Sequence, residues 1–285
     1  MILSVRSLIM KGSAGGENLS SQHAPLIDSH LHVWTRDMPL TATAWHTPPT
    51  NAPTEDCIRT LDEHGVVLAV IAAASIHGDY YDYVCRTLRA HRRFRATAVL
   101  RPTTDFFQME RMREEGFVGV RLMFSLSDEV PDITSPEYKV FFRRVADLGW
   151  HVHLVDKPDR IAASIAAVER SGPRLVIDHM GHLQTPEGRN HEGFKAILAA
   201  IERGRTWAKI SGRFRFIPPE SADQYAQDLL RVGGGDRILW GSDWPFAAYE
   251  GQVTYKSVLD DYYHLVPDIA MRRKIDETGL RFYFG

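Results

Sequence analysis

The sequence predicts an α/β fold, a single-domain (β/α)8 TIM barrel, from three observations. Short apolar runs rich in β-branched residues recur eight times, and amphipathic helical segments fill the gaps between them. No composition break or long linker interrupts this alternation. A barrel of eight such units needs about 250 residues, and the chain has 285. A doubly wound open sheet is the alternative, but no glycine-rich dinucleotide turn follows the first run.

The expected strands span residues 25–31, 66–74, 94–101, 117–124, 150–156, 174–180, 206–212 and 238–243. Runs such as VVLAVIAAA and RLVID are nearly continuous in apolar residues, which is typical of parallel strands buried on both faces. Several intervening helices have clear ends. Ser135 followed by Pro136 begins one helix and Gly149 ends it, while Gly116 ends the helix that follows Asp105.

Composition limits the classes of partner. The net charge of −2 predicts no general attraction to nucleic acid or anionic lipid, and no run of 18 apolar residues is present to cross a membrane. Cys57 and Cys85 form no disulfide framework, so a reducing, cytoplasmic setting is the default expectation. Residues 1–24, rich in Ser and Gly, are expected to be a flexible tail before a domain of residues 25–285. The sequence leaves a homo-oligomer open.

Polar side chains gather at the carboxyl ends of the expected strands, where barrels of this kind place their active sites. His30 and His32 lie two residues apart and therefore share one face of the first strand. The fifth strand carries His151 and His153 with the same spacing, so either can be the inward residue; His153 is preferred because it lies nearer the carboxyl end. Asp243 ends the eighth strand.

The sixth strand ends in Asp178 and His179. Because neighbouring residues on a strand point to opposite faces, we expect His179 to face the site and Asp178 to be structural. Asp28, just before the first histidine pair, is expected to orient a ligand or a loop. Lys209 and Ser211 alternate on the seventh strand, and either could touch a substrate.

This combination of imidazoles and a carboxylate suits hydrolytic chemistry. His30, His32, His153 and Asp243 are suitable ligands for one Zn²⁺ or Mn²⁺ ion, with a position left for water. Asp243 could then take a proton from water, and His179 could stabilise an oxyanion. A single histidine pair is weak evidence, since strand-end histidines often hydrogen-bond only to backbone; the set spread over four strands is far more specific.

The segments IDSHLHVW, HVHLV, VIDHMGH and ILWGSDWP resemble the amidohydrolase superfamily over nearly the whole chain. Within that superfamily, the DHMG and GSDWP segments look most like the 2-pyrone-4,6-dicarboxylate lactonases and sugar-acid lactonases. The resemblance implies hydrolysis of a small lactone. A related branch implies the alternative, metal-dependent decarboxylation of an aromatic or unsaturated acid. A barrel that only binds a ligand is a third reading, disfavoured because the costly polar groups are intact.

One position departs from the superfamily pattern. The fourth-strand residue that bridges two metals in binuclear members is Arg121 here, and a guanidinium cannot ligate a cation. We therefore expect one metal or none, since some lactonases of this branch work without metal. Arg121 is instead expected to bind a substrate carboxylate, with a salt bridge to a neighbouring acid as the alternative.

Further residues are candidates for the substrate pocket. Arg213 and Arg215 follow the seventh strand and could extend an anion pocket or form salt bridges. His182 stands where the dicarboxylate-binding relatives are expected to have a further arginine, which favours a substrate with fewer negative charges. Trp45 and His77 lie in loops after the first two strands, where their rings could stack on a flat substrate or simply pack.

Overall fold

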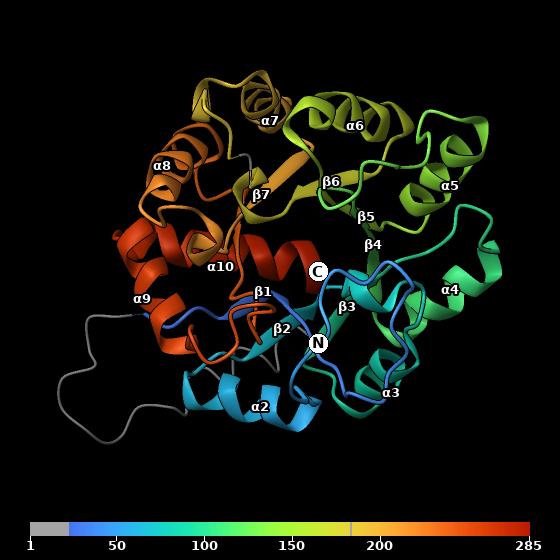
Figure 1. The fold of residues 1–285 in the computed structure, drawn as a ribbon, viewed down its shortest axis with the longest axis horizontal. Helices are drawn as coiled ribbons and strands as arrows, with labels where there is room; N and C mark the ends of the chain where they lie inside the picture. Colours follow the sequence, from blue (N-terminus) through green and yellow to red (C-terminus); the bar gives the residue numbers. More distant parts are fainter. Residues whose placement is uncertain (1–22, 183) are drawn as a thin grey trace.

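A computed structural model describes residues 23–182 and 184–285. Within them, eight parallel strands pair in sequence order, each with its neighbour along the chain, and helices cover the outside of the sheet (Figure 1). The strands are β1 (Ile27–Leu31), β2 (Leu68–Ile71), β3 (Phe94–Ala98), β4 (Phe117–Met123), β5 (His151–Val155), β6 (Arg174–Ile177), β7 (Thr206–Ile210) and β8 (Ile238–Trp240). The outer helices are α2 (Thr54–Glu63), α3 (Asp82–Ala90), α4 (Phe106–Glu115), α5 (Pro136–Asp147), α6 (Pro158–Ser171), α7 (Glu192–Glu202), α8 (Ser221–Gly233) and α9 (Tyr255–Leu265).

The sheet closes between its first and last strands, so the predicted barrel is confirmed and the open sheet is excluded. The backbone N–H of Asp243 donates to the carbonyl of His30 at 2.7 Å, and that of His32 donates to the carbonyl of Trp244 at 2.7 Å. Gly241 permits this close approach. A Cβ at this position would lie only 2.5 Å from the Cβ of His30.

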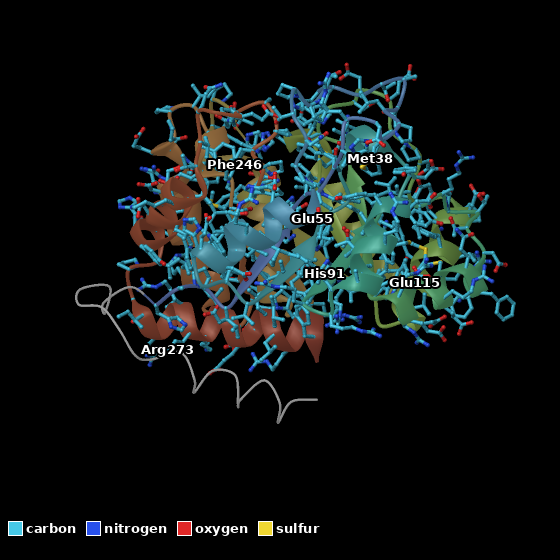
Figure 2. The ribbon with its side chains drawn as sticks, turned by 90° about the horizontal axis from the view of Figure 1, so that it is seen from below. Met38, Glu55, His91, Glu115, Phe246 and Arg273 are labelled. Atoms are coloured by element: carbon cyan, nitrogen blue, oxygen red, sulfur yellow. The ribbon has the colours of Figure 1, made fainter. Side chains whose placement is uncertain are left out.

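The C-terminal helix α10 (Ile269–Phe284) closes one end of the barrel. Phe282 and Tyr283 at its end are buried in an apolar cluster formed with residues of β2, β6 and β8. In the side view, Arg273 on α10 lies at the opposite end of the molecule from Met38 and Phe246, which belong to loops that follow β1 and β8 (Figure 2). The carboxyl ends of the strands are therefore the end available for a site.

The local signals read from the sequence act as expected. The Ser135 hydroxyl accepts from the backbone N–H of Tyr138 and begins α5. Asp105 caps α4 in the same way, and Gly116 ends that helix with a φ of 115°, in the left-handed region that favours glycine. Both cysteines, Cys57 and Cys85, are buried and unpaired.

The expected tail, residues 1–24, lies outside the described residues except for His23 and Ala24. The His23 ring contacts the Asp276 carboxylate on α10, with Nε2 2.9 Å from Oδ2. Across the described part of the chain, none of the helices combines the length and apolar character needed to cross a membrane.

Candidate active site

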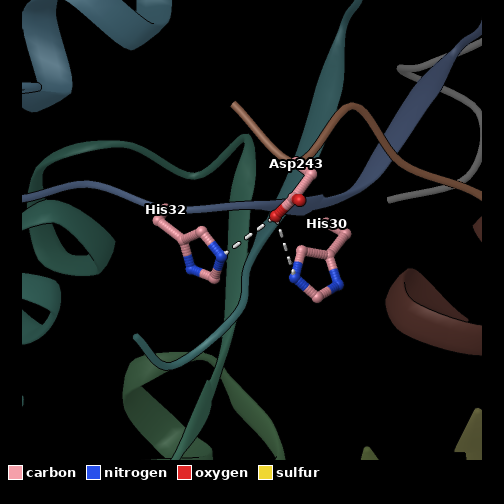
Figure 3. Close-up of side chains that lie close together, drawn as sticks. All are labelled: His30, His32 and Asp243. Carbon is pink, nitrogen blue, oxygen red and sulfur yellow. Dashed lines mark ion pairs between the residues drawn. The ribbon is translucent and has the colours of Figure 1, made fainter. Parts of the chain in front are cut away.

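His30, His32 and Asp243 meet where β1 and β8 end (Figure 3). Oδ1 of Asp243 lies 3.3 Å from Nε2 of His32 and 3.7 Å from Nε2 of His30. All three side chains are buried. Asp243 has a φ of 66°, a left-handed conformation that aspartate tolerates better than most residues and that is common at functional turns.

Asp28 ties β1 to the segment before Asp243. Its Oδ1 accepts from the backbone N–H groups of His30 at 3.1 Å and Ser242 at 2.9 Å, and its Oδ2 accepts from the Tyr255 hydroxyl at 2.9 Å. Burial raises the pKa of this carboxyl to about 6, against the opposing effect of these donors. Asp28 thus orients the two strand ends that carry the site.

Arg215 keeps the Asp243 carboxylate ionised. Its Nε donates to Oδ2 at 2.6 Å, which leaves Oδ1 directed at the two histidines. Burial opposes the charge, but the Arg215 guanidinium and the surrounding histidines outweigh it and hold the pKa of Asp243 well below its usual value.

His179 faces the same site from a short 3-10 turn rather than from a strand. β6 ends at Ile177, and His179 begins the turn η2 (His179–Gly181) with a φ of 51°. Its Nδ1 lies 2.9 Å from the Ser211 hydroxyl, and its Nε2 lies 4.0 Å from Oδ2 of Asp243. Burial lowers the pKa of His179 to about 3, so the ring is neutral near neutral pH.

Asp178 corrects one expectation from the sequence. Strand alternation continues through Asp178, whose backbone is extended and whose N–H donates to the carbonyl of Leu154 on β5, so its carboxylate lies inside the barrel, two residues after the inward-facing Val176. His179, with a φ of 51°, is the residue that departs from the alternation. Oδ2 accepts from Nε of Arg121 at 3.0 Å, and Oδ1 forms an ion pair with Nζ of Lys209 at 3.1 Å. Burial opposes this charge too, but these two cations and nearby histidines hold the pKa of Asp178 well below its usual value.

Lys209 lies at the centre of the barrel and is completely buried. Its Nζ is 3.1 Å from Nδ1 of His30 and 3.3 Å from Nδ1 of His153. Burial lowers the pKa of Lys209 to about 8, so the ammonium persists at neutral pH. Burial and this ammonium together keep the pKa values of His30 and His153 well below the usual value, and both rings are neutral.

Both histidines of β5 are completely buried in the barrel. His153 contacts the Lys209 ammonium through Nδ1, and its Nε2 lies 3.2 Å from the Tyr283 hydroxyl. His151 lies one step further from the site, with its ring 5.0 Å from that of Phe282 and 5.2 Å from that of Tyr283. The structure thus brings His153, rather than His151, into the polar cluster.

Among the described residues, two groups could hold a divalent ion. The four ligands expected from the sequence are spread over both groups. One group is His30, His32 and Asp243; the other is His30, His153 and Asp178. His153 belongs to the second group and not to the first.

The first group can present unprotonated ring nitrogens and a carboxylate to an ion. The His32 Nδ1–H donates to the carbonyl of Ala72 at 2.8 Å, so its Nε2 presents a lone pair next to Asp243. Nε2 of His30 is buried without a hydrogen-bond partner among the described residues. His30 can also present a lone pair there when its Nδ1–H faces Oδ1 of Asp178, 3.3 Å away.

A cavity of about 130 Å³ opens above this group and suits a small molecule. Two ionised arginines reach it, Arg121 from β4 and Arg215 from the loop after β7, and both already hold site carboxylates. Trp45 and His182 also line it. A more open cleft of about 440 Å³ lies between α2 and α9, but its lining contains none of the predicted site residues.

Two predicted substrate residues do not line this cavity. Arg213 donates through Nε to Asp223 and through Nη1 to Asp261, each at 2.9 Å, so the salt-bridge alternative holds for this residue. His77 is buried, with Nδ1 2.8 Å from the carbonyl of Pro39, and acts as a packing residue of its loop.

Comparison with known proteins decides the family. The sequence model described as amidohydrolase matches residues 27–278, most of the chain. The chain belongs to the amidohydrolase family.

This amidohydrolase is similar to lactone hydrolases. It is 25% identical to the 4-sulfomuconolactone hydrolase of Rhizobium radiobacter, over 87% of this chain and 86% of the relative. It is also 25% identical to the 2-pyrone-4,6-dicarboxylate hydrolase of Comamonas testosteroni, over 92% of this chain and 90% of the relative. The fold is also similar to the crystal structure of a probable 2-pyrone-4,6-dicarboxylic acid hydrolase from Acinetobacter baumannii with citric acid bound. The two superpose with a TM-score of 0.86 at 25% identity, over 91% of this chain and 99% of that chain. The resemblance read from the sequence motifs is confirmed.

The polar core of this amidohydrolase was underestimated from its sequence. Strand position alone predicts that Lys209 could touch a substrate and that Asp178 is structural, and it does not predict that the two side chains pair. A lysine in the middle of an apolar parallel strand, as in TWAKI, is itself a signal, because a buried ammonium is costly without a carboxylate partner.

Proposed function

We propose that this amidohydrolase hydrolyses a small lactone that carries one carboxylate. The observation that carries the proposal is a neutral imidazole, an ionised aspartate and two arginines converging on one small cavity. The similarity to hydrolases of sulfomuconolactone and pyrone dicarboxylate supports an ester bond within a ring as the target.

The charges that line the cavity favour a substrate with a single negative charge. Arg121 and Arg215 are cationic and Asp243 is anionic. Two positive groups and one negative group leave one positive charge to balance a ligand. Arg121 is the anchor we propose for the carboxylate, because its planar donors line the cavity.

Apolar side chains complete the cavity opposite these charges. They come from the end of β4 and from the segments that follow β1, β2 and β4, and they include Trp34, Ile76, Met123 and Leu126. Such a wall suits the hydrocarbon part of a single ring and limits the water that reaches the ester.

Catalysis by the chain's own residues follows from their protonation. Water attacks the lactone carbonyl while Oδ1 of Asp243 accepts its proton. Nε2–H of His179 donates to the carbonyl oxygen, with Ser211 donating to Nδ1 to hold that tautomer. The ring C–O bond then breaks, and Asp243 returns the proton to the leaving oxygen. The low pKa of Asp243 favours this return.

We further propose that the group of His30, His32 and Asp243 takes one divalent ion, Zn²⁺ or Mn²⁺. When bound, the ion would polarise the carbonyl and lower the pKa of water. The residue roles above do not depend on it. Hydrolysis that survives a chelator would show that the residues act alone; loss with the chelator and recovery with one equivalent of ion would assign the metal.

The decisive experiment compares Asp243→Asn with Asp223→Asn on a panel of mono- and dicarboxylated lactones. Both aspartates pair with an arginine, but only Asp243 faces the cavity. We expect Asp243→Asn to lower kcat by about 10²- to 10⁴-fold, the usual contribution of a general base, while Asp223→Asn leaves it unchanged. An intact kcat in Asp243→Asn, or release of CO₂ from an unsaturated acid without lactone opening, would refute the proposal.

A further inference from the structure

The second ligand group lies deeper in the barrel than the first. One ring nitrogen each of His30 and His153 and one oxygen of Asp178 lie within 4.8 Å of one another, and all three residues are completely buried. Oδ1 of Asp178 is 3.3 Å from Nδ1 of His30 and 3.8 Å from Nδ1 of His153. Two imidazoles and a carboxylate at this spacing have the composition of a transition-metal site. Both groups could hold an ion at once only if His30 lost its ring proton and offered one ring nitrogen to each ion.

The side chain of Lys209 already lies at this position. Its Nζ is 3.1 Å from Nδ1 of His30, 3.3 Å from Nδ1 of His153 and 3.1 Å from Oδ1 of Asp178. An ion at the usual bond lengths of about 2.0–2.2 Å from these atoms would overlap the ammonium.

Both oxygens of the Asp178 carboxylate already have a cationic partner. One of its oxygens pairs with Lys209, and the other accepts from Arg121. A second divalent ion would therefore meet two fixed positive charges with no carboxylate left to offset them.

We propose that the Lys209 ammonium takes the place of a second metal ion in this centre. It balances Asp178, occupies the space between His30, His153 and Asp178, and confines any divalent ion to the group of His30, His32 and Asp243. Lys209 is thus a positioning residue that sets how many ions the barrel accepts. This role is separate from the choice of substrate and does not depend on lactone hydrolysis.

The test measures Co²⁺ bound per chain, with the first group disabled by His32→Asn. After removal of free ion, His32→Asn is expected to retain none, because Lys209 blocks the second group. His32→Asn with Lys209→Met, a substitution of similar length without charge, is expected to retain one ion per chain. Adding His153→Asn should abolish that ion, and Lys209→Arg in place of Lys209→Met should retain none.

Controls keep the result interpretable. Lys195→Met in the His32→Asn background removes an exposed lysine that pairs only with Glu192, and it should not create a site. Thermal unfolding identifies variants that fold. The wild-type protein provides a test without any substitution. If it retains two Co²⁺ ions per chain, the proposal is overturned. A folded His32→Asn, Lys209→Met variant without ion would overturn it equally.

Discussion

Two arginines in one short turn provide a sharp test of the site. Arg213 and Arg215 both belong to η4 (Arg213–Arg215), and both pair with aspartates. Arg215 lines the cavity and holds Asp243, whereas Arg213 points to acids on α8 and α9. Replacing each by Met removes the same charge at nearly the same place, but only one substitution should affect catalysis.

The size of the effect follows from the contact that Arg215 makes. A hydrogen bond to a charged group contributes about 1.5–3 kcal/mol, and each 1.4 kcal/mol corresponds to about tenfold. Arg215→Met should therefore lower kcat/KM by about 10- to 150-fold. Arg213→Met should leave kcat/KM unchanged and reduce only thermal stability.

The pH profile gives a second, independent signature. Arg215 is the main group that holds the pKa of Asp243 down, against the burial that raises it. Without Arg215, the pKa of Asp243 rises, and the carboxylate becomes protonated at a higher pH than in the wild type. Activity of Arg215→Met should then fall on the acid side where the wild type is still active.

The assay is initial-rate lactone opening, followed by the acid released, from pH 4 to pH 8. Equal losses for the two arginine variants would show that η4 matters only for folding. An Arg215→Met profile parallel to that of the wild type would refute the control of Asp243 by this guanidinium.

Three further predictions concern the barrel interior. Asp178→Asn should lower the free energy of unfolding by about 3–5 kcal/mol, because two buried cations lose their partner; urea denaturation measures this, and exposed Asp128→Asn should show no change. The His179 ring should stay neutral from pH 7 to pH 5, because its pKa is about 3; an NMR titration of its ring signals with a midpoint near the usual histidine pKa of about 6.5 would contradict its burial. Gly241→Ala should destabilise the fold, since its Cβ would lie 2.5 Å from that of His30, and an unchanged melting temperature would show that the seam between β8 and β1 can move.

The sequence by itself determined the barrel and the main members of its site. Eight apolar runs separated by helices specify a parallel sheet through local patterning, and the closed topology brings every strand's carboxyl end to one mouth. For that reason His30, His32 and Asp243 could be placed together from strand position alone.

The tertiary structure decided what each side chain faces once the strands end. Asp178 reaches the interior by strand alternation, whereas His179 reaches it because its φ of 51° begins a turn that departs from the alternation. Arg213 and Arg215 diverge because a 3-10 turn has about three residues per turn, so positions two apart point to different sides. Lys209 contacts His30 on β1, His153 on β5 and Asp178 at the end of β6. Such contacts depend on side-chain direction and on long-range packing, which no local pattern records.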